Sequence, residues 1–270
     1  MDLIVATVLL RPYVFAFLAA FLVAGAADLG WRRTLVFGAT VWPLAWLSEF
    51  ASTRVGLPFG LYHYTEATRG RELFIADVPF MDSLSFTFLA YAAFCLARAA
   101  AGRPVSRTAL ATTAGFLMML LDVVIDPLAV RGDRWFLGHI FYYADGGSYF
   151  GVPLSNFAGW WLVGTASVGW YVYWSGDGEL GSGRWWPVRG TRGRRGAVGP
   201  GVALYYAVLG FNLAITAWIG EWLLLVAGLT IHAAVGAALL TWPRSSAGFT
   251  RARSGGRHRK GGEAALRGYR

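Results

Sequence analysis

The residues of this sequence that could do chemistry are a few acidic side chains at the ends of apolar segments. Glu49 closes one such segment, where a carboxylate is costly unless it faces the protein interior, a water pocket or a charged partner. Two interpretations stay open. Glu49 forms an interfacial ion pair with Arg54, or it is a buried carboxylic acid whose pKa is raised by burial and which donates a proton.

A second acidic pair, Asp122 and Asp126, is spaced four residues apart and therefore shares one face of a helix that ends at Pro127. Two carboxylates at this spacing repel each other, so one tends to keep its proton, which makes them a workable acid and base. Two alternatives remain open. Asp126 ends the helix while Asp122 bonds to a neighbouring helix, or the pair binds a divalent cation together with Glu49.

The segment 52–65 is dense in residues that restrict the backbone, because two glycines and a proline lie within five positions. Such a fixed path predicts that the loop presents side chains to a substrate. The substrate-binding residues expected here are Arg54, Phe59, Tyr62, His63 and Tyr64. His63 also fits a structural role. Asn156, at the start of a later helix, fits either a capping hydrogen bond or an amide that orients water.

A weak internal duplication relates these segments. In each half, an acidic helix end is followed by a long aromatic loop, and the next helix opens with VPFMD at 78–82 or with VPLSN at 152–156. Proline suits the first turn of a helix. Because a short match of this kind arises easily by chance, the repeat remains a hypothesis.

The elements that must position these residues are predicted to be membrane-spanning helices. Charged residues make up only 14% of the chain, whereas soluble domains carry about 25%. About seven stretches approach the roughly 20 apolar residues that a span needs. They are 13–27, 34–50, 83–97, 108–126, 153–174, 202–219 and 222–242, and the first could extend back past Pro12 to Leu3. The expected fold is an all-α, polytopic membrane bundle.

The distribution of lysine and arginine predicts the orientation of this bundle. Most basic residues follow the first, third and fifth stretches or lie in the tail, and the positive-inside rule places those segments in the cytoplasm. The N-terminus is then outside and the C-terminus inside. Residues 1–243 form the transmembrane domain, 175–200 a flexible connection, and 244–270 a disordered basic cytoplasmic tail.

Composition and motifs exclude several function classes. The formal net charge of +9 is interpreted as topology signals and lipid contacts, so no nucleic-acid partner is expected. The only lysine, Lys260, lies in the tail, which excludes a retinal Schiff base. No metal-binding Cys/His motif, phosphate loop, nucleophile elbow or dinucleotide fingerprint is present, and the single Cys95 cannot form an internal disulfide.

The longest motifs lie in and around the two loops on the outer side. They are EFxSTRxGxPFGxYxYT at 49–65, DxxxDP at 122–127, Trp135, Tyr142-Tyr143, and GxPxSNFxGW at 151–160. Through these motifs, the chain resembles the membrane-embedded CruF-type carotenoid 1,2-hydratases over about residues 13–174. The last two helices and the tail carry little of the resemblance.

The resemblance implies that water adds to the terminal C1=C2 double bond of an acyclic carotenoid end and gives a tertiary alcohol. The implied partners are a carotenoid substrate and the lipid bilayer, and an association with other enzymes of the carotenoid pathway stays open. Protonation at C2 would make a tertiary cation at C1, which water captures. This chemistry needs a buried acid, a positioned water and aromatic faces that stabilise the cation.

We therefore expect Glu49 or Asp126 to be the acid, with Asp122 and Asn156 orienting the water. Trp135, Tyr142 and Trp160 are expected to join the loop residues in binding substrate, and neither a metal nor a cofactor is required. Two other functions stay open. One is a carotenoid- or lipid-binding protein without catalysis. The other is a metal-dependent isoprenoid-lipid enzyme, which would need a further aspartate-rich site that this sequence lacks.

Overall fold

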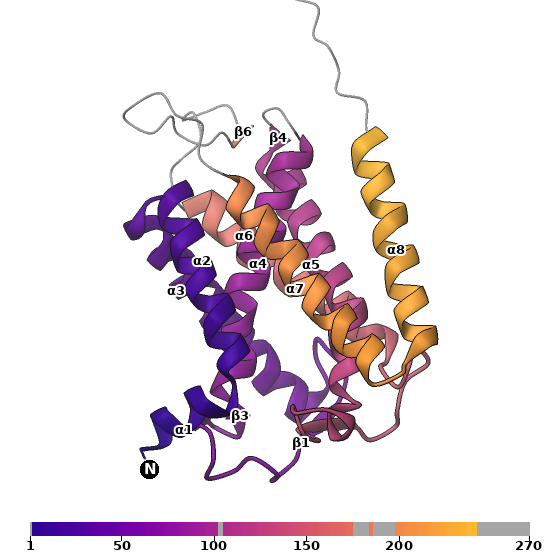
Figure 1. The fold of residues 1–270 in the computed structure, drawn as a ribbon. Helices are drawn as coiled ribbons and strands as arrows, with labels where there is room; N and C mark the ends of the chain where they lie inside the picture. Colours follow the sequence, from indigo (N-terminus) through magenta and orange to yellow (C-terminus); the bar gives the residue numbers. More distant parts are fainter. Residues whose placement is uncertain (1, 102–104, 175–183, 186–197, 242–270) are drawn as a thin grey trace, which may run out of the picture.

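The protein is a bundle of long helices closed at one end by two paired loops (Figure 1). The computed structural model describes residues 2–101, 105–174, 184–185 and 198–241. The helices in these residues are α1 (Leu3–Leu10), α2 (Pro12–Asp28), α3 (Trp31–Val55), α4 (Phe80–Ala101), α5 (Arg107–Ala129), α6 (Leu154–Trp174), α7 (Val198–Trp218) and α8 (Trp222–Thr241). Helices α2 to α8 correspond to the stretches predicted from the sequence. The predicted tail and nearly all of the predicted flexible connection lie outside the described residues.

Four of these helices, α4, α5, α7 and α8, are long and apolar enough to cross a membrane. A fifth span is reached if α1 and α2 count as one broken span. Helices α3 and α6 fall short because polar, glycine and aromatic residues interrupt their apolar runs. The chain thus has four to five candidate spans among its described residues, fewer than the seven stretches suggested.

The first apolar stretch does not continue back to Leu3, because the chain bends by 89° between α1 and α2. Pro12 begins α2, where its missing N–H leaves no bond unmade. The preceding Arg11 is buried and reaches into the outer loops, where its Nη2 lies 3.0 Å from Glu72 Oε1 and its Nη1 donates to Leu137 O at 2.9 Å. The buried charge is therefore paired, and it ties the start of α2 to both loops.

The core is centred on α4, whose residues from Phe86 to Ala97 are all buried. Helices α5 and α6 approach closely through glycine, since a Cβ at Gly115 would lie only 2.5 Å from Thr165 N. Small residues of this kind allow close helix packing in membranes. In contrast, α8 lies at the edge of the bundle, with Leu223 73% and Val226 59% exposed (Figure 1). Such an apolar outer surface is suited to lipid.

The two long connections pair with each other over the ends of α3 and α5. Strand β1 (Tyr62–Tyr64) is antiparallel to β5 (Phe141–Tyr143), and β2 (Phe74–Ile75) forms a hairpin with β3 (Val78–Pro79). A 3₁₀ turn, Gly132–Arg134, precedes β5. At the other end of the bundle, β4 (Val105–Ser106) pairs with β6 (Arg184–Trp185). The β1–β5 pair forms a roof over the interior of the bundle.

Candidate functional site

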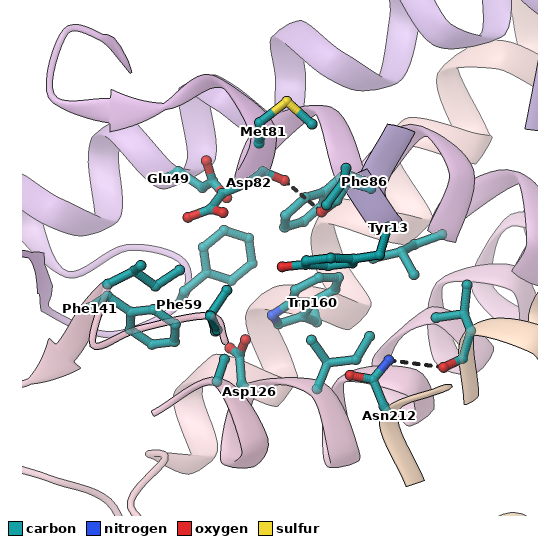
Figure 2. A pocket seen from close by; sticks show the side chains of 18 of the residues that line it. Tyr13, Glu49, Phe59, Met81, Asp82, Phe86, Asp126, Phe141, Trp160 and Asn212 are labelled. Atoms are coloured by element: carbon teal, nitrogen blue, oxygen red, sulfur yellow. Dashed lines mark hydrogen bonds between the residues drawn. The ribbon is translucent and has the colours of Figure 1, made fainter. Parts of the chain in front are cut away.

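A cavity of about 140 Å³ lies beneath this roof, between the helices. Most of its lining is aromatic or aliphatic, and helices α2 to α7 all contribute to it. The polar side chains in the lining are Glu49, Asp82, Ser85, Asp126, Asn156, Asn212 and several tyrosines. Figure 2 shows Glu49 and Asp82 side by side on one wall, with Asp126 on another and aromatic rings between them.

Glu49 lies two turns before the end of α3 and is only 4% exposed. Within the described residues its Oε2 atom has no hydrogen-bond partner. The suggested ion pair with Arg54 is not formed, because Arg54 points outward and pairs with Asp77. A buried carboxyl group without a cation is far less costly as the neutral acid than as the carboxylate. Glu49 therefore meets the geometric requirement for a proton donor facing an apolar cavity.

Asp122 and Asp126 do share one face of α5, and Asn156 from the first turn of α6 joins them. The Nδ2 atom of Asn156 donates to Asp122 Oδ2 at 2.6 Å and to Asp126 Oδ2 at 2.8 Å. Asp126 lines the cavity, whereas Asp122 is fully buried behind it. Asn156 thus bridges the carboxyl groups, as an amide that orients reacting groups would.

The described residues contain no group of three or more His, Cys, Asp or Glu side chains arranged to hold a metal ion. Glu49 faces the cavity from α3 and does not join Asp122 and Asp126 as a third ligand. Within the described residues, the structure thus brings no third such ligand to Asp122 and Asp126.

Asp82 is a site residue to which the sequence reasoning gave no role. It lies in the first turn of α4, lines the cavity and is the nearest acidic neighbour of Glu49 (Figure 2). The internal duplication contains the signal that could have found it, because Asp82 occupies the position in VPFMD that Asn156 occupies in VPLSN. In both halves the residue at this position lies beside an acidic side chain of the preceding long helix.

Aromatic rings form the walls between the acidic groups. Phe86 stacks on Trp160 with ring centroids 4.2 Å apart, and Phe59 lies against both rings. Trp135 closes the cavity farther along, next to Tyr13. Ring faces attract cations through their quadrupole. The walls can therefore stabilise a carbocation without offering a nucleophile.

Three tyrosines of the roof face the cavity: Tyr62, Tyr64 and Tyr143. Burial raises the pKa of each phenol. All three therefore stay neutral at physiological pH. As neutral phenols they can both donate and accept a hydrogen bond.

Three residues expected to bind substrate lie outside the cavity lining. Tyr142 is 43% exposed, because successive residues of β5 alternate and Phe141 and Tyr143 take the inner face. His63 alternates in the same way on β1 and packs against the ring of Tyr142. Tyr142 and His63 therefore lie outside the cavity lining, and their contact with substrate stays a prediction.

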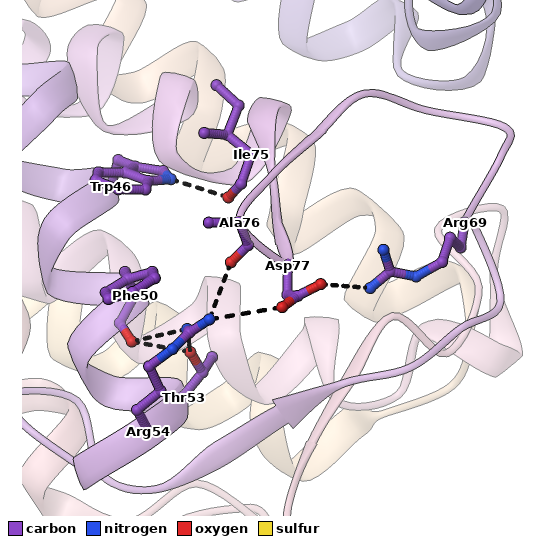
Figure 3. Close-up of polar contacts among 8 residues, drawn as sticks. All are labelled: Trp46, Phe50, Thr53, Arg54, Arg69, Ile75, Ala76 and Asp77. Carbon is purple, nitrogen blue, oxygen red and sulfur yellow. Dashed lines mark hydrogen bonds and ion pairs between the residues drawn. The ribbon is translucent and has the colours of Figure 1, made fainter.

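Arg54, the third of these residues, holds the loops together from outside (Figure 3). Its guanidinium lies 3.6 Å from the centroid of the Phe50 ring and pairs with Asp77, which also binds Arg69. Nearby, Trp46 donates to Ile75 O at 3.1 Å. These contacts fix the β2–β3 hairpin against α3, and through it the position of Asp82 at the start of α4.

Helix α7 also contributes to the cavity, although the sequence analysis assigned it no functional residue. Val208, Phe211 and Asn212 line the side that faces α2. The Nδ2 atom of Asn212 is satisfied by Val208 O at 2.9 Å, in its own helix. The cavity thus extends from the acidic groups into an apolar arm between α2 and α7.

Comparison with known proteins adds a family and a relative. The family model described as carotenoid biosynthesis protein matches residues 7–236. The chain is 30% identical over 148 residues to the bisanhydrobacterioruberin hydratase of Haloarcula japonica. These aligned residues make up 54% of this chain and 47% of that protein. The chain therefore spans about half the length of the curated relative it matches. No solved structure matches the chain.

Proposed function

Because the chain belongs to the family of carotenoid biosynthesis proteins, we propose that it is a carotenoid hydratase. It adds water to the terminal C1=C2 double bond of an acyclic carotenoid end and gives a tertiary alcohol. One observation carries the proposal: an apolar cavity between two carboxyl-bearing walls. On one wall a buried carboxyl oxygen has no hydrogen-bond partner among the described residues, and on the other an amide bridges a carboxyl pair. The distant relationship of the chain to a bisanhydrobacterioruberin hydratase supports the same activity.

The size of the cavity suits one end group of the substrate. At about 140 Å³ it compares with an engineered cavity of about 150 Å³ that binds benzene. A branched isoprenoid end of a few carbons fits such a space, and a whole carotenoid does not. The apolar arm lined by Val14, Phe17 and Phe211 gives the direction in which the polyene would leave between α2 and α7 into the bilayer.

In the proposed mechanism Glu49 carries the proton and transfers it to C2 of the alkene, which leaves a tertiary cation at C1. The rings of Phe59, Phe86 and Trp160 surround this cation. Water then attacks C1 and loses a proton to Asp126, whose position Asn156 and Asp122 fix. Each step is general acid or general base catalysis by a positioned carboxyl group.

The hydrogen bonds favour Glu49 over Asp126 as the acid. Asp126 accepts a hydrogen bond from Asn156, and such a donor stabilises a carboxylate. Glu49 Oε2 has no donor within the described residues. We therefore assign the acid to Glu49 and the base to Asp126.

Pigment analysis of a carotenoid-producing host, with and without this protein, tests the proposal. A new pigment whose mass is greater by one or two molecules of water is the expected result. Unchanged pigments that copurify with the protein would instead indicate a binding protein without catalysis. A longer carbon chain would indicate prenyl transfer, and either of these outcomes would rule out the hydratase.

We further propose that α2 to α8 all cross the membrane, with the N-terminus and the roof outside. Cys95 is the single cysteine of the sequence, so its replacement by alanine gives a cysteine-free background. In that background, Glu66→Cys is expected to react with a membrane-impermeant maleimide in intact cells. Ser106→Cys, at the other end of the bundle, is expected to react only after lysis. The reverse labelling pattern would overturn the orientation.

A further inference from the structure

A row of side chains along the roof connects the two acidic walls of the cavity. Tyr62 and Tyr143 are direct partners in the β1–β5 pair, and Tyr64 follows Tyr62 on the same face of β1. The hydroxyl oxygens of Tyr62 and Tyr64 are 3.5 Å apart. Tyr64 lines the cavity together with Asp82, which lies beside Glu49 (Figure 2). At the other end, the ring centroids of Tyr143 and Tyr62 are 5.7 Å apart, and Tyr143 lines the cavity together with Asp126.

After the proposed hydration, the acid and the base each have the wrong protonation state for a second turnover. Glu49 has lost a proton to the alkene, while Asp126 has gained one from water. Direct exchange with bulk water is hindered for Glu49, which is 4% exposed and lies beneath the roof. The enzyme therefore needs an internal route that returns a proton from Asp126 to Glu49.

We propose that Tyr143, Tyr62, Tyr64 and Asp82 form this return route, an inference that rests on the proposed function. The O–H bond of Asp126 breaks, and each group along the row gains one proton as it passes its own to the next. The O–H bond of Glu49 forms last. Nothing is oxidised or reduced, and the net reaction remains alkene plus water to alcohol.

The chemistry of these groups suits the task. Each neutral phenol has one proton to give and lone pairs to accept another. The Tyr62–Tyr64 distance is at the long limit for a hydrogen bond, and a small side-chain rotation or a bridging water would close it. A wall that only needed bulk and a ring face could use phenylalanine, as Phe141 does beside Tyr143.

The route is tested by measuring the hydration rate of Tyr64→Phe, a variant that keeps the ring and loses only the hydroxyl. The rate is measured for a single turnover and at steady state. The purified protein is mixed with an acyclic carotenoid that has an unhydrated C1=C2 end, first with protein in excess and then with carotenoid in excess. The first turnover should stay within about threefold of wild type, since Glu49 already holds its proton. Steady-state turnover should fall about tenfold or more. Tyr62→Phe should behave alike, and Tyr206→Phe, an exposed control on α7, should change neither rate.

Two outcomes overturn the route. One is a first turnover slowed as much as steady state, which would mean that the hydroxyl positions substrate. The other is no change in either regime. If the wild-type protein forms no alcohol in either regime, the proposed function fails and the route with it, so the two failures are distinguishable.

Discussion

Glu49→Gln is expected to reduce carotenoid hydration by about 10²–10⁴-fold, the usual contribution of a general acid. The amide keeps the shape and polarity of the side chain but has no acidic proton for C2 of the alkene. The rate is measured as alcohol formed per protein molecule by chromatography of the extracted pigment. Retention of unreacted carotenoid on the purified variant shows that binding survives.

The variant should fold, because Glu49 takes part in no ion pair among the described residues. Replacing it with a neutral side chain therefore leaves no buried cation there without its partner. Glu66→Gln is the matched control, since the side chain of Glu66 is 73% exposed and lies outside the cavity. That variant should hydrate at the wild-type rate. Normal amounts of hydroxylated pigment from Glu49→Gln would show that another group is the acid.

The helices could be predicted from the sequence because apolar runs of sufficient length leave few alternatives. Each predicted stretch from 13–27 onward lies within or close to one helix of the structure. The number of spans could not be settled in the same way. Helices α3 and α6 carry the polar residues of the site, such as Glu49 and Asn156. The side chains that give the cavity its chemistry are thus the ones that lower the apolarity of these helices.

The two walls of the site differed in how far they could be predicted. The proximity of Asp122 and Asp126 follows from helical spacing alone, and their common partner Asn156 was recognised as a polar residue at a helix start. The pairing of Glu49 with Asp82 depends on how α3 and α4 pack, which no local pattern states. Only the analogy between VPFMD and VPLSN could have pointed to it.

The inward and outward sides of the roof could not be predicted, because they depend on the register between two loops far apart in the sequence. The pairing of Tyr62 with Tyr143 places both in the cavity. A shift of one residue would have turned His63 and Tyr142 inward instead. From the sequence alone, residues on both faces were expected to bind substrate. Aromatic density pointed to both loops but did not separate the side chains that line the cavity from those outside it.

Asp126→Asn is expected to lower the hydration rate by about 10²-fold or more, because the asparagine cannot take the proton that water releases on attacking C1. Asp126 lines the cavity, whereas Asp122 is buried behind it and reaches the site through Asn156. Asp122→Asn should therefore cost less, about tenfold, through misplacement of Asn156 and Asp126. Both rates are measured on purified protein with the same carotenoid.

This difference separates a base from its support. If Asp126 is the base, Asp126→Asn loses activity at every pH, whereas Asp122→Asn keeps a reduced rate. An Asp122→Asn variant that loses more activity than Asp126→Asn would reverse the roles. Wild-type activity in Asp126→Asn would leave the attacking water without a proton acceptor on this wall. In that case the remaining carboxyl groups of the cavity, Glu49 and Asp82, would have to perform both proton transfers from one side of the substrate.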